Sequence, residues 1–380
     1  MRDDIYEQLR RIEFNKTEPE VLTELVKEAI RYGTNHSSFL SRLHDKAIKV
    51  IDILKNNKLL HEIEVNDYTY SKMKAIGIDG SMQITGNIGR WFVMLSAVIV
   101  KFEDITSIPK VMPAVQIEEI NEPDPKEANR IAEEKMFLME SKAIKKAALE
   151  ADNNTILFID GPVIDPPYYT SEEYIKFRCE AFSNWLSKGA FVLGITKRVL
   201  GNLFINFVIN NILSNDDKSL IKDLYSDYAL ACYVFTSLFR NSNGNHIFCT
   251  VPFNILDLKD KEDRFTKNIY SLAETYNKYN INIYTMLIQT SISAKPIRID
   301  IPIISGNQKN LDIQKVCSIL KNWSPPSHFL PLPIILAHTK CNIRKGCAEV
   351  IYNEIISRGS SSDYLHNLIN MKLTGELEYE

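Results

Sequence analysis

Two aspartates, Asp79 and Asp160, each end an apolar, strand-like run, and each is followed by glycine. A buried strand holds such a carboxylate rigidly, and the glycine lets substrate or metal approach the backbone. An Asp-Gly pair can instead form a simple hairpin turn. The second pair weakens that interpretation, because Pro162 follows it and a crossover helix is expected there. Converging carboxylates are what phosphodiester hydrolysis by two divalent metal ions requires.

A third carboxylate, Glu140, lies on the helix predicted between the two aspartates. It shares a helical face with Met136, Ala143 and Ala147, so we expect it to point toward a sheet. The alternative is a partly exposed glutamate on an amphipathic helix. The order of Asp79 on a first strand, Glu140 on a first helix and Asp160 on a fourth strand reproduces the carboxylate arrangement of RNase H-like enzymes.

His338 and Lys197 are the remaining candidates. His338 ends an apolar run and precedes several basic residues. An imidazole suits Mn²⁺ as well as a carboxylate does, which makes His338 a candidate ligand, although most lone histidines are structural. Lys197 ends the strand-like run AFVLGITK and is expected at the same sheet edge as the aspartates. It could neutralise a scissile phosphate, or it could be an ordinary lysine at a strand end.

Hydrophobic periodicity predicts the elements that position these residues. Residues 1–57 show helical spacing, with a break between helices expected around Gly33 to Ser38. From residue 74 the pattern becomes β-β-β-α-β-α-β, which is an antiparallel meander followed by parallel strands joined through helices. This order predicts an α/β fold with an RNase H-like mixed sheet flanked by helices and an N-terminal helical extension. Further strands are expected within 246–304.

Composition limits the partners and the compartment. The net charge of −3 means that any contact with DNA must come from a local basic patch. The six cysteines form no CxxC pair and fit a reducing cytosol. The N-terminus lacks the apolar core of a signal peptide, and the longest apolar run, 92–100, is too short to span a bilayer. We therefore expect a cytoplasmic protein without a membrane segment.

The ordered set of motifs resembles the NurA nuclease family. The matching segments are GIDGS at 77–81, the helix of Glu140, LFIDGP at 157–162, LGITK at 193–197, SDY at 226–228, RID at 298–300 and LPIILAH at 332–338. The resemblance covers roughly residues 70–345. It divides the chain into an N-terminal helical extension at 1–65 and a NurA nuclease domain at 66–380. It departs from many members at Asp300, where they carry glutamate, and it leaves Tyr225, Tyr228 and Tyr233 as candidates for the family's functional tyrosine.

The resemblance also implies an activity. Family members are archaeal or thermophilic bacterial Mn²⁺-dependent nucleases that degrade single- and double-stranded DNA from 5′ to 3′ and cut single strands internally. They form ring-like homodimers that dock on the hexameric HerA ATPase for DNA end resection in double-strand break repair. By this resemblance, Asp79, Glu140, Asp160 and His338 would ligate two ions, Mn²⁺ or Mg²⁺.

Two other functions stay open on the residues alone. A phosphotransferase or ATPase with an actin-like fold also begins with an Asp-Gly turn, but it needs a second glycine-rich phosphate loop, and the chain has only 14 glycines. A scaffold subunit without catalytic activity would keep the fold and lose the chemistry. Retention of all four candidate ligands argues against that function. The further acids Asp165, Asp227 and Asp300 are expected to have structural roles.

Overall fold

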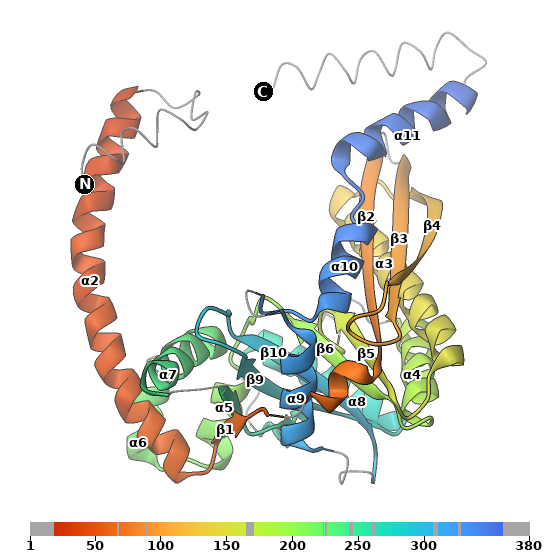
Figure 1. The fold of residues 1–380 in the computed structure, drawn as a ribbon. Coiled ribbons are helices and arrows are strands. Elements are labelled where there is room, and N and C mark those ends of the chain that lie inside the picture. The colour runs from red at the N-terminus through yellow and green to blue at the C-terminus, as the bar shows by residue number, and fades with distance from the viewer. Residues whose placement is uncertain are drawn as a thin grey trace.

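The computed structural model is built around one large mixed sheet (Figure 1). It describes residues 19–359 except 67, 88–89, 165–170, 223, 225, 243–245, 260–262, 307–310 and 326–327. Within these residues the sheet has 10 strands in the order β1-β7-β9-β10-β6-β5-β2-β3-β4, and β8 pairs with β9 off this path. The strands are β1 (Leu60–Glu64), β2 (Lys74–Asn87), β3 (Arg90–Phe102), β4 (Lys110–Asn121), β5 (Thr155–Asp160), β6 (Phe191–Thr196), β7 (His246–Thr250), β8 (Phe253–Asn254), β9 (Ile281–Gln289) and β10 (Ile297–Ile304).

Helices flank this sheet and extend from it. They are α2 (Pro19–Asn56), α3 (Pro125–Ala147), α4 (Glu172–Leu186), α5 (Leu203–Asn211), α6 (Asn215–Lys222), α7 (Asp227–Asn241), α8 (Arg264–Lys278), α9 (Ile313–Trp323), α10 (Leu332–Cys341) and α11 (Lys345–Gly359), with short 3-10 helices η1 (Thr69–Lys72), η2 (Ala148–Glu150) and η3 (Ile255–Asp257). None of the described helices is both long and apolar enough to cross a membrane.

The predicted RNase H-like strand order is confirmed. β2, β3 and β4 form an antiparallel meander, β5 then adds in parallel beside β2, and β6 adds in parallel beside β5. The crossover from β4 to β5 runs through α3, which begins where the Asp124 side chain accepts the Lys126 N–H and Pro125 occupies the first turn. The crossover from β5 to β6 runs through α4. Trp185 joins the two helices by donating its indole N–H to the Ile144 carbonyl at 2.8 Å.

The two faces of the sheet carry different helices. Side chains alternate along a strand, so Ile76 and Ile78 of β2 join the core beneath α3 and α4. Ala75 of the same strand joins the core beneath α9 and α10. Residues at the odd positions of β2 and the even positions of β5 therefore lie on the α9–α10 face. Asp79 and Asp160 both occupy such positions.

One strand boundary differs from the prediction. β2 does not end at Asp79 but continues to Asn87, and it pairs with β3 from Ala75 to Asn87. Asp79 lies opposite Val98 in the interior of the strand, and Gly80 lies opposite Ala97 rather than in a turn. The pairing with the long strand β3 supplies backbone hydrogen bonds past the Asp-Gly pair, which local sequence does not reveal. Asp160, in contrast, is the last residue of β5.

The predicted helix break around Gly33 to Ser38 is wrong, because α2 is continuous. A side chain at Gly33 would meet nothing within 4 Å, so this glycine lowers helix propensity without forcing a turn. Among the residues of α2 whose side chains are described, those that belong to the core are Val50, Ile51 and Leu54 in its C-terminal turns, and the helix backbone before them projects from the body (Figure 1). β1 lies within the predicted extension yet pairs with β7 in the sheet, and the division at residue 65 stays a prediction.

Asp227 fixes the start of α5 from within the core. Its carboxylate accepts the backbone N–H groups of Phe204 and Ile205 at 2.9 and 3.0 Å. Burial raises the pKa of Asp227 from 3.8 to about 6, against the lowering effect of those N–H groups and of Arg298. The structural role expected for Asp227 agrees with this geometry.

Asp227→Asn should change how stability depends on pH. The pKa of Asp227 is higher in the folded protein than in the unfolded chain, so its contribution is present below pH 4 and is lost as the pH rises through 6. Raising the pKa from 3.8 to about 6 corresponds to about 3 kcal/mol. Urea unfolding without metal should show the unmodified protein losing that much relative to Asp227→Asn between pH 4 and pH 7. A difference that stays constant over this range would contradict the assignment.

Candidate metal centre

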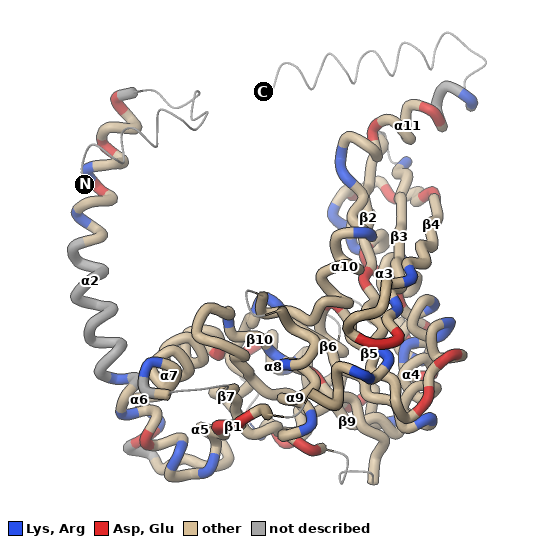
Figure 2. The backbone as a smooth tube through the Cα atoms, in the orientation of Figure 1, with Lys and Arg blue, Asp and Glu red and all other residues tan. Residues whose placement is uncertain are grey.

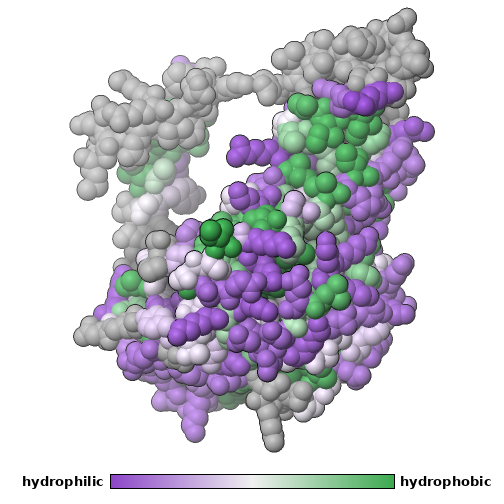
Figure 3. Space-filling view, turned by 45° about the vertical axis from the view of Figure 1, so that its right-hand side comes forward, coloured by the Kyte–Doolittle hydropathy of each residue, from purple (hydrophilic) through white to green (hydrophobic). Residues whose placement is uncertain are grey.

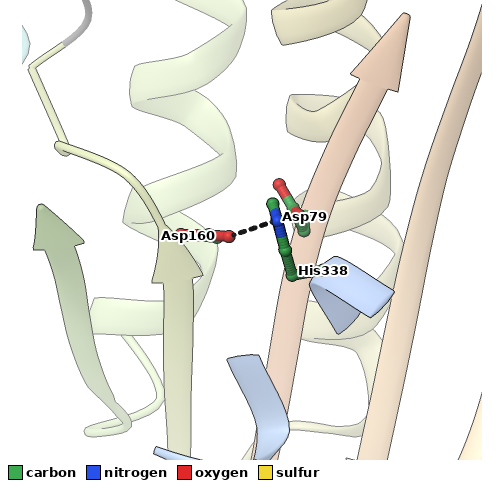
Figure 4. A group of neighbouring side chains, drawn as sticks. All are labelled: Asp79, Asp160 and His338. Carbon is green, nitrogen blue, oxygen red and sulfur yellow. Dashed lines mark hydrogen bonds and ion pairs between the residues drawn. The ribbon is translucent and has the colours of Figure 1, made fainter. Parts of the chain in front are cut away.

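Asp79, Asp160 and His338 meet at one point on the α9–α10 face of the sheet (Figure 4). His338 Nδ1 lies 2.8 Å from Asp79 Oδ2 and 3.1 Å from Asp160 Oδ2. The two carboxylates are almost fully buried, whereas 57% of the His338 side chain is exposed. One potential ligand atom from each residue lies within 4.8 Å of the others. The strands β2 and β5 therefore hold the two carboxylates in place, and the cluster is open to solvent on the side of His338.

The donor set fits a divalent cation. Two carboxylates and an imidazole are oxygen and nitrogen ligands of the kind that Mn²⁺ and Mg²⁺ accept. In an octahedral site with bonds of about 2.1 Å, neighbouring ligand atoms are about 3.0 Å apart. The spacings of 2.8 and 3.1 Å around Nδ1 are close to this value. His338 can therefore take a position adjacent to each of the two aspartates around one ion with little movement.

Gly77 allows helix α10 to bring His338 to the strands. A Cβ atom at Gly77 would lie 2.3 Å from the Pro333 carbonyl oxygen and 2.8 Å from the Pro333 Cβ atom. Such separations are far below van der Waals contact, so the first turn of α10 packs directly against the backbone of β2. Only glycine at this position permits that approach.

The other end of α10 is tied to the same two strands. Ser96 of β3 donates its hydroxyl to the Cys341 carbonyl, and Ser81 of β2 accepts the Ile343 N–H at 3.2 Å. The Cys341 thiol donates to Asp79 Oδ2 at 3.1 Å. Burial and the neighbouring Asp79 raise the pKa of Cys341, so the thiol keeps its proton as a donor. These contacts fix the position of α10 along its own axis, and this position sets the distance between His338 and the two carboxylates.

The backbone after Asp160 is held by a separate set of contacts. Gly161 has a φ of +130° and donates its N–H to the Ile195 carbonyl at 3.0 Å. Asp300 then accepts the Val163 N–H at 3.2 Å. The Asp300 carboxylate is fully buried and also accepts two hydrogen bonds from Arg298, at 2.9 and 3.1 Å. Asp300 thus supports the loop that follows Asp160 and lies outside the cluster, as its expected structural role requires.

Lys197 lies at the cluster, at the sheet edge where it is predicted. Its ammonium group donates to Asp160 Oδ2 at 2.5 Å. Burial and the nearby Asp79 carboxylate raise the pKa of Asp160 to about 6, while Lys197 and His338 act in the opposite direction. Two buried carboxylates this close repel each other, and the adjacent Lys197 ammonium group offsets part of that cost.

Glu140 is buried next to the centre but does not join the three-residue cluster. Its helix α3 covers the opposite face of the sheet, and its carboxylate accepts a hydrogen bond from Arg178 at 3.0 Å. Both side chains are almost completely shielded from solvent. Glu140 Oε2 lies 3.5 Å from the place where a Cβ atom of Gly80 would be. Because Gly80 has no side chain, the Glu140 carboxylate can lie close to strand β2, next to the residue that follows Asp79.

Sequence reasoning missed two residues that shape this centre, Arg178 and Gly77. Arg178 lies on an amphipathic helix, where an arginine is usually exposed, and no local signal marks it as buried. The role of Gly77 depends on Pro333, which is distant along the chain. Of the candidate tyrosines, Tyr228 is partly exposed at the start of α7. Tyr225 and the acid Asp165 lie outside the described residues.

Gly77→Ala should displace α10 and disturb the metal centre. The added methyl group would collide with the Pro333 carbonyl, and overpacking of this kind costs about 1–3 kcal/mol. We expect a lower free energy of unfolding in urea together with weaker Mn²⁺ binding in a calorimetric titration. The matched control is Gly33→Ala on α2, which meets open space and should raise stability by up to about 1 kcal/mol. Unchanged unfolding and Mn²⁺ binding in Gly77→Ala would show that α10 does not need this contact.

The sequence and the fold were compared with those of known proteins. Residues 73–340 match the NurA domain family model. The crystal structure of the NurA nuclease from Sulfolobus solfataricus is 15% identical, covers 90% of this chain and 97% of that chain, and gives a TM-score of 0.57. A crystal structure of NurA with manganese is 10% identical, covers 88% of this chain and 99% of that chain, and gives a TM-score of 0.51. No curated protein matches the chain. The two structures show a shared fold, and the family match spans more than half of the sequence, so the chain belongs to the NurA family of nucleases.

Proposed function

We propose that this protein is a Mn²⁺-dependent deoxyribonuclease whose centre is formed by Asp79, Asp160 and His338, with Glu140 completing it. The observation that carries the proposal is the convergence of two buried carboxylates and one exposed imidazole within 4.8 Å. Membership in the NurA family and the fold shared with a structure of NurA with manganese support the choice of metal.

The chemistry follows from the position of each side chain. A divalent metal ion held here would lower the pKa of water and polarise the scissile phosphate. Asp79 and Asp160 are held by strands and supply the negative charge that attracts the cation. With a cation at the site, Asp160 would pair less strongly with Lys197. The Lys197 ammonium group would then hold a phosphate oxygen at the same edge of the sheet.

Glu140 would serve a second ion. The Glu140 carboxylate lies beside Asp79 across the strand, where Gly80 leaves room, but Arg178 holds it in the absence of metal. A second ion must compete with this buried, charge-assisted hydrogen bond. We therefore expect the site of Asp79, Asp160 and His338 to bind its ion more tightly than the site that includes Glu140.

The surface near the centre supports DNA as the substrate. Lys340 and Arg344 are exposed on α10 and just after it, and Lys345 begins α11. Figure 2 shows these basic segments along α10 and the start of α11, in a chain whose net charge is negative. Such a local patch provides phosphate contacts without making the whole protein basic. By family membership we propose 5′ to 3′ degradation of single- and double-stranded DNA, internal cutting of single strands, and a role in DNA end resection during break repair.

We also propose a homodimer and a HerA-type hexameric ATPase as protein partners. Hydrophobic side chains are exposed along α2, at Val21, Leu25 and Tyr32, and on the edge strand β4. Figure 3 shows apolar surface gathered on the part of the molecule that carries β2, β3, β4 and α11. Patches of this kind are typical of protein interfaces. The proposed compartment is the cytoplasm, where the free cysteines would stay reduced.

Replacing either aspartate with its amide should abolish the activity and leave the fold intact. Asp79→Asn and Asp160→Asn keep the side-chain shape but remove the charge that holds the cation. We expect cleavage of single-stranded DNA in Mn²⁺ to fall by at least about a thousandfold, in line with the loss of a group that acts in the transition state. The control is Asp52→Asn, at an exposed position in the C-terminal turns of α2, which should cleave at the normal rate. Full activity in Asp79→Asn would disprove the assignment, and an inactive unmodified protein that binds no Mn²⁺ would support a scaffold subunit instead.

Glu140→Gln should change the number of bound ions. If Glu140 serves only the second ion, this variant should bind one Mn²⁺ per chain where the unmodified protein binds two, as counted by electron paramagnetic resonance. Glu173→Gln, at an exposed position near the start of α4, is the control and should leave the count unchanged. An equal count in Glu140→Gln and the unmodified protein would remove Glu140 from the centre.

A further inference from the structure

A cavity lies on the same face of the sheet as the metal centre, apart from that centre. Its volume is about 440 Å³, and it lies where the C-terminal end of α9 meets the segment that leads into α10. Side chains of α9 and α10 belong to one core cluster, which places both helices on this face. The described lining residues are Tyr68, Ile105, Thr290, Ser291, Lys321, Asn322, Trp323, Ser324, Pro325, His328 and Leu332.

The inner wall of this cavity, which we call the Lys321 cavity, is fixed by buried contacts. The Trp323 indole N–H donates to the Tyr70 carbonyl at 2.9 Å, and Asn322 accepts the Ser71 N–H at 3.1 Å. The Trp323 ring packs against Phe102, with ring centroids 5.7 Å apart. The cavity is therefore formed by the fold itself and needs little rearrangement to receive a ligand.

The charge of the cavity favours an anion. Lys321 is about half buried, and its ammonium group donates to the Thr290 carbonyl at 3.1 Å. None of the described lining residues is acidic, and no carboxylate pairs with Lys321 among the described residues. Burial lowers the pKa of Lys321, because removal from water disfavours its charged form. A cation that is partly removed from water without a counter-ion is stabilised when an anion binds.

Ser324, which lines the same cavity, adds a hydrogen-bond donor. Its hydroxyl oxygen is shielded from solvent, and it has no hydrogen-bond partner within the described residues. Buried polar groups in folded proteins are nearly always satisfied, so a free hydroxyl in a cavity marks a place for a ligand atom. An ammonium group and a hydroxyl are the donors that proteins use to hold phosphate oxygens.

Aromatic rings line the outer part of the cavity. Tyr68 is 57% exposed. His328 is also exposed, and its ring stacks on Phe329 with ring centroids 6.1 Å apart. Exposed aromatic faces stack nucleobases without regard to sequence. A phosphate site next to an aromatic face in a cavity of this size suits one nucleotide.

The cavity and the metal centre are connected by α10. Leu332 lines the cavity and begins the helix, and His338 follows six residues later, a rise of about 9 Å. We propose that the Lys321 cavity holds one nucleotide of the single-stranded DNA whose scissile phosphate lies at the metal centre, with its phosphate on Lys321 and Ser324 and its base against Tyr68. This assignment rests on the proposed nuclease function.

The test compares two lysines of the same helix. Lys321→Met keeps the aliphatic stem and removes the charge, and Lys315→Met is the matched control. Lys315 is also on α9 and partly buried, but its ammonium group lies 3.6 Å from the centre of the Phe191 ring and lines a different cavity. Binding of fluorescein-labelled oligothymidylate is measured by anisotropy in EDTA, so that no strand is cut, over a series of salt concentrations.

Lys321→Met should bind the oligonucleotide about five- to tenfold more weakly, and the slope of log affinity against log salt should decrease in magnitude by about 0.7, the value for one phosphate contact on a single strand. Tyr68→Ala should weaken binding at least about fivefold without a change in that slope, because stacking carries no charge. Lys315→Met should match the unmodified protein in both quantities. Equal affinity and equal slope in Lys321→Met and Lys315→Met would overturn the assignment.

Thermal unfolding of each variant separates loss of binding from loss of folding. If Lys321→Met unfolds early, Ser324→Ala takes its place, and unchanged affinity in that variant counts against the cavity. Failure of the nuclease proposal gives a different result. The unmodified protein would then leave the same oligonucleotide uncut in Mn²⁺, whereas the binding comparison in EDTA does not depend on cleavage.

Discussion

The direct packing of helix α10 on strand β2 is the contact on which the metal centre depends. The strands alone supply two carboxylates on one face of the sheet, and the third ligand arrives only because Gly77 lets the backbone at Pro333 come within contact distance. Two serines of β2 and β3 and the Cys341 thiol then fix the helix along its axis. The position of His338 is therefore set by backbone packing, and it does not require a metal ion to draw the helix in.

Charge balance explains how two buried aspartates are tolerated next to each other. Asp79 and Asp160 raise the cost of ionisation at the centre, which appears as the raised pKa of Asp160. Lys197 and His338 reduce that cost, and Arg178 does the same for Glu140 on the other face of the sheet. A divalent cation bound by the two aspartates and His338 would replace Lys197 as the positive partner of Asp160. The site is thus assembled in a form that a cation stabilises, and the displaced group, Lys197, is left where a phosphate would bind.

Local sequence predicted the elements well where the signal was periodic and failed where distant contacts decide. The apolar runs before Asp79 and Asp160 and the amphipathic helix of Glu140 predicted the β-β-β-α-β-α-β order, which is confirmed. The end of β2 was misplaced because its extension depends on pairing with β3. The continuity of α2 past Gly33 could not be seen, because glycine weakens a helix without having to end it. Glu140 was expected to face the sheet and does, but its partner Arg178 lies on another helix and gave no signal. The approach of Pro333 to Gly77 joins segments that only the fold brings together.

The central claim is that Asp79, Asp160 and His338 bind one divalent cation on the α9–α10 face of the sheet. The most direct measurement is a crystal structure of the protein soaked in Mn²⁺, with the ion located from its anomalous scattering. The account predicts an anomalous peak bonded to both aspartate carboxylates and to His338 Nδ1, with α10 in its present place. A peak bonded to other residues, or no peak between these three side chains at saturating Mn²⁺, would contradict it.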